Sequence, residues 1–443
     1  MGSRHGRRPM KWRAAQGGLL AALALLLAAC GSSSTSTRGQ RALPTATATP
    51  AVPAKPAPPP PDYHLLLANE TISRMTLDQE LGQIFVVAYQ YTDANEPSLT
   101  RMITEMGAGG VIIYPGFNVV SIAQTKALTD AMQAAAPIPL IIGADEEGGG
   151  DEQLGQIFPP HMAAYQIGAT GDPKVAAQQA DIIAGQLKQL GINADFAPIV
   201  DVEAPDRIWT RAFGHDPQMV TRLGIAQVDA YQNDGIIACP KHFPGLGGAD
   251  SNPHFSLPVI NFSKDYLEAH DWVPYRALLS HHPGMIMTTD LLMPALDPVM
   301  PAELSQPIVT GILRNEIGYD GVVITDALYM EGITAHYSMA QAGVLAIQAG
   351  NDMLEGLAGP DQMRVMVDAL RQAVDSGQIS KARIDQSVRR ILLLKMQYGL
   401  FHLPIPRGEQ RAGMLVSAAP GLFVAAPGVG LLPDPRRRMP RGG

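Results

Sequence analysis

The chain lacks three features that would point to particular classes of protein. It has only two cysteines and no cluster of Cys and His at metal-ligand spacing, so we expect neither a metal site nor a cofactor. It has 33 Lys and Arg against 41 Asp and Glu, and this formal net charge of -8 leaves no basic footprint for nucleic acid. The apolar run at 18–29 has twelve residues, whereas roughly 20 are needed to span a bilayer. The remaining composition, 46% hydrophobic and 17% charged, is typical of a large globular protein.

The N-terminus has the pattern of an export signal. The apolar run follows a cluster of cationic residues, Arg4, Arg7, Arg8, Lys11 and Arg13. Leu27-Ala28-Ala29-Cys30 comes next and resembles a bacterial lipobox. We therefore expect residues 1–29 to be removed and Cys30 to carry a lipid anchor on the extracytoplasmic side of the cell membrane. A plain secretory signal with an incidental cysteine is the alternative.

Removal of this leader would change the formal net charge from -8 to -13, because it holds five cations and no acid. With Cys30 lipidated, Cys239 would be the remaining thiol, which excludes an intramolecular disulfide. The apolar setting Ile-Ile-Ala-Cys-Pro predicts that Cys239 is buried in a strand rather than reactive.

Two further segments lack the composition of a folded core. Residues 30–62 are rich in Ser, Thr, Ala and Pro, which predicts an extended tether. Residues 403–443 are rich in Pro, Gly and Arg without a sustained period, which predicts a flexible tail. A surface contact through the arginines of the tail is the alternative.

Residues 63–402 alternate apolar runs with amphipathic stretches. Eight runs are candidate strands: 84–89, 110–114, 140–144, 194–202, 236–239, 285–289, 322–325 and 352–354. Helical periodicity at 174–190, 217–233 and 304–317 supplies the crossovers that parallel strands need. The pattern predicts an α/β fold, a (β/α)8 TIM barrel. An open doubly wound sheet is the structural alternative.

Polar and charged residues follow most of the predicted strands. They are Asp145, Asp201, Lys241, His242, Asp290, Asp326 and Glu355. Because barrel enzymes place catalytic groups on the loops after the strands, these side chains are expected at one rim. Charged residues also follow strands merely because loops face water, but the adjacent Gly and Pro residues favour tightly shaped loops over solvated turns.

Two segments carry a family resemblance. Residues 241–258 read Lys-His-Phe-Pro-Gly-Leu-Gly-Gly-Ala-Asp-Ser-Asn-Pro-His-Phe-Ser-Leu-Pro, and residues 321–332 read Gly-Val-Val-Ile-Thr-Asp-Ala-Leu-Tyr-Met-Glu-Gly. Together they resemble the family 3 glycoside hydrolases, and the likeness extends over about 73–401. The nearest subgroup is the β-N-acetylglucosaminidases that trim cell-wall fragments. Many other members carry a second domain, for which we expect no room after residue 402.

The resemblance implies roles for six residues. Asp326 would be the nucleophile and His254 the general acid/base of a retaining mechanism. Asp145, Arg211, Lys241 and His242 would bind the sugar. Each has a structural alternative: Asp326 could cap a helix, His254 could lie in an ordinary surface loop, and Lys241-His242 could form a network at a strand end.

The sequence departs from the subgroup at two places. Where the family loop reads Asp-Ser-His, this chain has Asn252, Pro253 and His254, so the carboxylate that orients the histidine is missing. Asp250 could replace it if the loop were rearranged. In the loop after the third strand, arginines usual in the family are replaced by Gly150, Asp151, Glu152 and Gln153, an acidic setting that disfavours a sugar bearing a carboxylate.

These observations predict an exported glycosidase that removes terminal β-linked N-acetylglucosamine from cell-wall or chitin-type glycans by double displacement. We expect a monomer whose partners are a glycan with a terminal β-linked sugar and, through the anchor, a membrane. The alternatives are a β-glucosidase or β-xylosidase, a weakened barrel that binds glycans without cleaving them, and a phosphorylase on the same scaffold.

Overall fold

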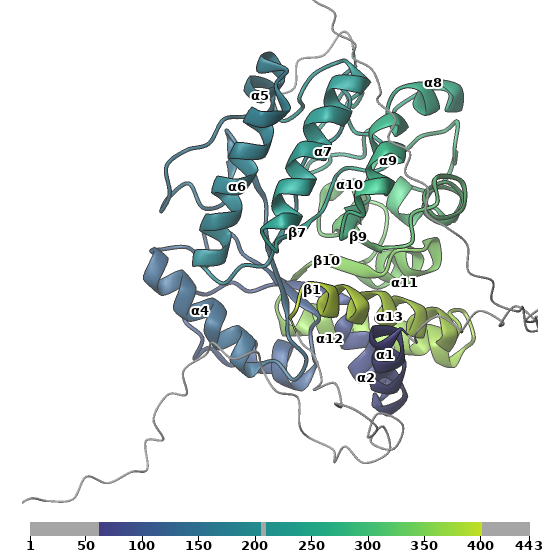
Figure 1. Cartoon of the computed structure of the whole chain (residues 1–443). Coiled ribbons are helices and arrows are strands. Elements are labelled where there is room, and N and C mark those ends of the chain that lie inside the picture. Colours follow the sequence, from purple (N-terminus) through teal and green to yellow (C-terminus); the bar gives the residue numbers. More distant parts are fainter. Residues whose placement is uncertain (1–61, 205–209, 401–443) are drawn as a thin grey trace, which may run out of the picture. The chain divides into compact units, whose positions relative to one another are not determined.

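The computed structural model describes residues 62–204 and 210–400, and eight parallel strands form its centre (Figure 1). The expected signal peptide, Cys30, nearly all of the tether and the tail lie outside these residues. The strand order is β7-β6-β3-β2-β1-β10-β9-β8. Figure 1 shows α6, α7, α12 and α13 around the outside of the strands. Within the described part of the chain, no helix is both long and apolar enough to cross a membrane.

The sheet closes on itself. The segment just after the edge strand β7 is joined to the other edge strand, β8, by backbone hydrogen bonds, from Phe243 N–H to the Met287 carbonyl at 2.8 Å and from Met287 N–H to the Pro240 carbonyl at 3.1 Å. A parallel bridge also joins Phe243 to Thr288. The predicted (β/α)8 barrel is therefore confirmed, and the open sheet is wrong.

All eight predicted strands are present. They are β1 (Phe85–Ala88), β2 (Gly110–Ile112), β3 (Ile141–Ala144), β6 (Ala194–Asp195), β7 (Ile237–Ala238), β8 (Met285–Met287), β9 (Val322–Ala327) and β10 (Met353–Ala358). A hairpin, β4 (Glu146–Gly148) and β5 (Asp151–Glu152), follows β3. Cys239, just after β7, is fully buried as predicted, and burial raises the pKa of its thiol.

The longer helices cover the barrel from outside. They are α1 (Tyr63–Arg74), α2 (Leu77–Gln83), α4 (Ile122–Ala135), α5 (Ala164–Thr170), α6 (Pro173–Gln189), α7 (Pro217–Asn233), α8 (Lys264–Ala269), α9 (Trp272–Leu278), α11 (Met339–Ala349), α12 (Pro360–Asp375) and α13 (Lys381–Gln397). Shorter turns are α3 (Pro97–Leu99), α10 (Glu331–Thr334), η2 (Leu279–His281) and η3 (Ala302–Leu304), and η1 (Thr100–Glu105) and η4 (Pro307–Ile317) are π-helical.

Two of these helices begin with the same sequence signal. Asp172 and Asp216 each accept a backbone N–H bond two residues on, and a proline occupies the first helical position of α6 and of α7. An Asp cap satisfies an otherwise unpaired N–H, and proline has no N–H to satisfy. The helical periodicity at 174–190 and 217–233 is confirmed by α6 and α7.

Strand boundaries differ from the prediction at two places. The run at 194–202 is a strand only at Ala194–Asp195, followed by a single bridge between Ile199 and Lys241. Pro198 interrupts this run because proline cannot donate to a sheet ladder. In contrast, β10 continues to Ala358, so that Glu355 lies within the strand rather than after it.

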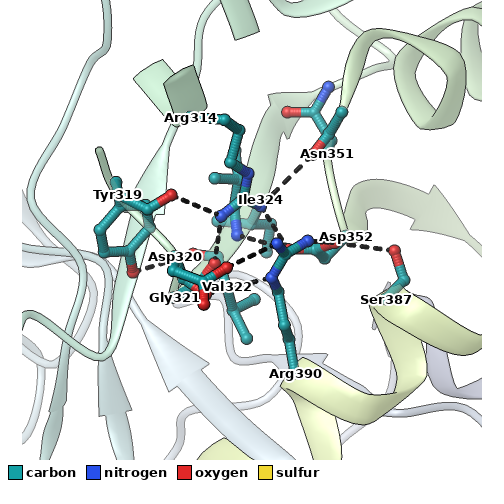
Figure 2. Close-up of polar contacts among 12 residues, drawn as sticks. Arg314, Tyr319, Asp320, Gly321, Val322, Ile324, Asn351, Asp352, Ser387 and Arg390 are labelled. Carbon is teal, nitrogen blue, oxygen red and sulfur yellow. Dashed lines mark hydrogen bonds and ion pairs between the residues drawn. The ribbon is translucent and has the colours of Figure 1, made fainter. Parts of the chain in front are cut away.

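A buried polar cluster fixes the last helix to the barrel at the start of β10. Figure 2 shows Arg314 and Arg390 converging on Asp352, from which their closest nitrogens lie 2.5 and 3.3 Å. Ser387 Oγ, on α13, donates to the same carboxylate at 2.8 Å. Burial alone would raise the pKa of Asp352, but Arg314, Arg383 and Arg390 outweigh burial and lower it.

Candidate active site

A cavity of about 300 Å³ opens at the carboxyl ends of the strands. All six side chains predicted to act on the sugar line it, namely Asp145, Arg211, Lys241, His242, His254 and Asp326. They come from four separate stretches of the chain that follow β3, β6 and β7 or end β9. The predicted convergence of these residues is therefore what the structure shows, while their roles stay predictions.

Asp326 lies at the end of β9 and is held by neighbours rather than by a helix. Thr289 Oγ1 donates to its Oδ2 at 3.0 Å, and the Ala327 N–H donates to its Oδ1 at 2.8 Å. The next helix, α10, begins five residues later with Met330 as its N-terminal cap. The helix-cap alternative for Asp326 is therefore wrong, and its carboxylate is oriented in the cavity.

Three buried carboxyl groups surround Asp326 and have raised pKa values. Burial, and then the charge of Asp326, raises the pKa of Asp290 to about 9. Burial also raises the pKa of Glu303 and of Glu355 well above the ordinary value. Burial and the charge of Asp326 therefore both favour the protonated form of Asp290, which lessens the repulsion between the two groups.

Elsewhere in the cavity, Lys241 and Arg211 share Glu147. Lys241 Nζ lies 2.6 Å from Asp145 Oδ1 and 2.6 Å from Glu147 Oε1. Arg211 Nε and one terminal nitrogen donate to the two oxygens of Glu147 at 2.8 and 2.9 Å. Burial alone would raise the pKa of Glu147, but Lys241 and Arg211 outweigh burial and lower it. Gln153, in the loop that resembles the family's arginine-bearing loop but lacks arginine, donates to Asp145 Oδ2 at 3.0 Å.

His242 is fixed by a buried aspartate. Its Nδ1 lies 2.7 Å from Asp201 Oδ2, and its backbone N–H donates to the same oxygen at 3.1 Å. Because a carboxylate accepts, the Nδ1 atom carries the proton. Lys241 and His242 therefore do form a network at the strand end, but the same residues also line the cavity.

The loop that carries His254 reaches the cavity with Asn252 and Pro253 beside it. His254 Nδ1 lies 2.9 Å from Asn252 Oδ1, so the amide takes the position of the missing carboxylate. Asp250 is exposed and is not among the lining residues, so the structure does not bring it to the histidine. His254 is itself exposed but faces the cavity, which argues against an ordinary surface loop.

Gly332 positions this loop. Its N–H donates to the Pro253 carbonyl at 3.0 Å, and a Cβ at this position would lie 2.3 Å from Asp290 Oδ2. Any other residue would therefore displace either the loop or a buried carboxyl group.

Sequence reasoning gave no role to several groups of the site. Tyr114 lies two residues after β2, and its hydroxyl donates to Glu355 Oε1 at 3.1 Å. The backbone N–H of Asp326 donates to Glu303 Oε2 at 3.1 Å. Glu303 comes from a short turn without a motif, so no sequence signal pointed to it. Glu147 was part of a visible acidic motif, Asp-Glu-Glu-Gly-Gly, but only the fold pairs it with Arg211.

Comparison with known families decides the identity of this barrel. The family model described as the glycosyl hydrolase family 3 N-terminal domain matches residues 76–394. The chain belongs to glycosyl hydrolase family 3. The match spans all eight barrel strands and every cavity residue named above.

Family 3 relatives include several β-hexosaminidases. Beta-hexosaminidase A of Pseudoalteromonas piscicida is 32% identical over 370 residues, which cover 72% of this chain and 61% of that protein. Beta-hexosaminidase LpqI of Mycobacterium tuberculosis is 30% identical over 387 residues, which cover 85% of this chain and 96% of that protein. The chain thus spans less than two thirds of the first enzyme and nearly all of the second.

Among solved structures, this family 3 chain is similar to a β-N-acetylglucosaminidase from Paenibacillus sp. str. FPU-7. The TM-score is 0.69 at 33% identity, and the match covers 81% of this chain and 66% of that one.

Proposed function

We propose that the protein is a retaining glycosidase that removes terminal β-linked N-acetylglucosamine from glycans. The observation that carries the proposal is Asp326, which ends a barrel strand with its carboxylate oriented by Thr289 in the cavity that His254 also lines. The similarity to β-hexosaminidases supports the choice of sugar.

The chemistry follows from the two groups. Asp326 attacks the anomeric carbon while His254, as imidazolium, gives its proton to the departing glycosidic oxygen. A covalent glycosyl ester on Asp326 results. Water then attacks the anomeric carbon, His254 takes its proton, and the Asp326 carboxylate leaves. Each group returns to its starting state.

The charges of the cavity favour a neutral sugar. Asp145, Glu147 and Asp151 lie on one wall, where Lys241 and Arg211 are already engaged with Glu147. A carboxylate on the substrate would be repelled by this acidic wall, because Lys241 and Arg211 already pair with Glu147. Hydroxyl groups of a neutral sugar can instead donate to the carboxylates and accept from the lysine.

We also propose that the enzyme is exported and anchored by lipid at Cys30. The support is the sequence order of cationic segment, twelve-residue apolar run and Leu-Ala-Ala-Cys. An anchor followed by a Pro-rich tether at 31–62 would hold the barrel away from the membrane surface, where cell-wall fragments are accessible.

A panel of chromogenic β-glycosides tests the substrate. The proposal expects release from the N-acetylglucosaminide and little from the glucoside or xyloside, without dependence on added phosphate. Release mainly from the glucoside or xyloside would assign a different sugar, and release only with phosphate would indicate a phosphorylase. Binding of the sugar without release from any glycoside would indicate a barrel that has lost its chemistry.

A further inference from the structure

Three side chains that could bind a metal converge behind the hairpin that forms one cavity wall. They are Glu146, Glu152 and His161, and one potential ligand atom from each lies within 4.8 Å of the others. Glu146 and His161 are not among the residues that line the cavity, whereas Glu152 is, so the cluster lies behind the cavity wall and shares one residue with it. None of the three is used by the chemistry above.

The hairpin explains how the two glutamates meet. Glu146 of β4 pairs with Glu152 of β5 in antiparallel register, and residues directly opposite each other point to the same face. Successive side chains alternate between faces. Accordingly Asp145, Glu147 and Gln153 interact in the cavity wall, whereas the carboxylates of Glu146 and Glu152 turn toward His161.

The cluster is buried and its polar atoms are incompletely paired. The side chains of Glu146, Glu152 and His161 are 0%, 6% and 6% exposed. Both ring nitrogens of His161 and Oε1 of Glu146 are buried without a hydrogen-bond partner. Two buried carboxylates face one imidazole here, and buried charge without full compensation is costly. A dication would compensate both carboxylates and coordinate atoms that make no hydrogen bond.

The distances fit a small transition-metal ion. His161 Nδ1 lies 3.5 Å from Glu146 Oε1 and 3.2 Å from Glu152 Oε1. A tetrahedral zinc ion with bonds of about 2.0–2.1 Å places neighbouring ligand atoms roughly 3.3 Å apart. The imidazole disfavours Ca²⁺ and Mg²⁺, which prefer oxygen ligands alone.

We propose that Glu146, Glu152 and His161 form a binding site for a divalent transition metal, with zinc as the best match. Three protein ligands leave the fourth tetrahedral position to water. The metal would join the two strands of the hairpin to the segment after it, and thereby stabilise the wall that presents Asp145, Glu147 and Gln153 to the cavity. The sequence gave no sign of this site because the ligands are spaced six and nine residues apart, and two of them are carboxylates in an acidic loop.

Zinc titration of the chelator-treated full-length protein tests the site. The wild type is expected to bind one zinc ion through this cluster and to melt a few degrees higher in excess zinc. His161→Gln should lose at least ~100-fold in affinity, because even loss of an outer-shell partner can cost that much. Glu146→Gln with Glu152→Gln provides a second test if His161→Gln does not fold, as judged by circular dichroism.

Two histidine variants serve as controls. His254→Ala removes the histidine of the sugar cavity, and His281→Gln removes one that pairs with Asp229 near the surface, 2.8 Å away. Both should keep wild-type zinc affinity. Absence of zinc binding by the wild type, or equal affinity in folded His161→Gln, would overturn the proposal and leave an imidazolium shared by two glutamates. Loss of binding only in His254→Ala would place the zinc in the sugar cavity and also overturn it.

Discussion

Asn252 Oδ1 lies 2.9 Å from His254 Nδ1, and the same oxygen accepts the His254 backbone N–H at 3.0 Å. The amide therefore orients the ring as a carboxylate would, with a proton on Nδ1. It differs from a carboxylate in carrying no net charge. In this arrangement Nε2 can donate only when the ring is an imidazolium, so the acid step requires the charged form of His254.

Asn252→Asp is expected to extend activity to higher pH. A carboxylate beside the ring favours imidazolium, so His254 would remain a competent acid as the pH rises, and the basic limb of the rate profile would shift upward. The measurement is kcat/KM against pH. Asn252→Ala serves as the control, because it removes the acceptor without adding charge and should show no upward shift. An unchanged basic limb in Asn252→Asp would argue against His254 as the acid.

His254→Ala is expected to discriminate between leaving groups. General acid catalysis contributes about 10²–10⁴-fold, and activated aryl glycosides depart without this help. Substrates with poor leaving groups should therefore lose far more rate than nitrophenyl glycosides. Comparable losses for both classes would mean that the proton comes from another group, and Asp250→Ala would then be the next variant to assay.

Asp352→Asn is expected to destabilise the barrel without acting on the cavity. Removing one partner of a buried ion pair costs about 3–5 kcal/mol. The pKa of Asp352 is lowered, so its stabilisation is complete above the unfolded pKa of about 3.9 and is lost as the pH falls through the lower folded value. Urea unfolding at pH 7 and below pH 4 measures both effects.

Asp320→Asn is the matched control for this measurement. Asp320 also contacts Arg390, but its side chain is 91% exposed, so its removal should cost at most about 1 kcal/mol. Equal losses in the two variants would contradict the role assigned to the buried cluster.

Cys30→Ser is expected to release the exported protein from the membrane fraction. Lipidation needs the thiol, and residues 31–62 offer no apolar segment to retain the chain. Fractionation of cells expressing wild type and variant measures this, with glycosidase activity as the check that the barrel is intact. Membrane retention of the processed variant would rule out the lipid anchor.

The sequence predicted the barrel and its rim well because both depend on local patterns. Apolar runs that end in Asp145, Lys241 and Asp326 predict parallel strands with their chemistry at one end. In contrast, Glu303 enters the site through a backbone turn far from any motif, and no periodic pattern marks it. The pairing of Glu147 with Arg211 likewise depends on a contact between residues 64 apart, which only the folded chain specifies.

The sequence also did not show where one of the strands ends, or which way the side chains of the hairpin after β3 point. The run at 194–202 looked like one strand because most of its residues are apolar, although Pro198 interrupts the regular ladder. The sequence showed the segment after β3 only as an acidic loop. Its hairpin divides the carboxylates between two faces, with Glu147 facing the sugar cavity and Glu146 facing His161.

Trapping of the covalent intermediate tests the central claim most directly. Asp326→Ala should lower kcat on the order of 10⁴-fold with the fold retained, but loss of rate alone does not locate the nucleophile. The wild type should therefore be incubated with a fluorinated slow substrate of the N-acetylglucosamine series, digested and sequenced by mass spectrometry. The account predicts one sugar esterified to Asp326. A label on Asp201, Asp290 or Glu355 would contradict it.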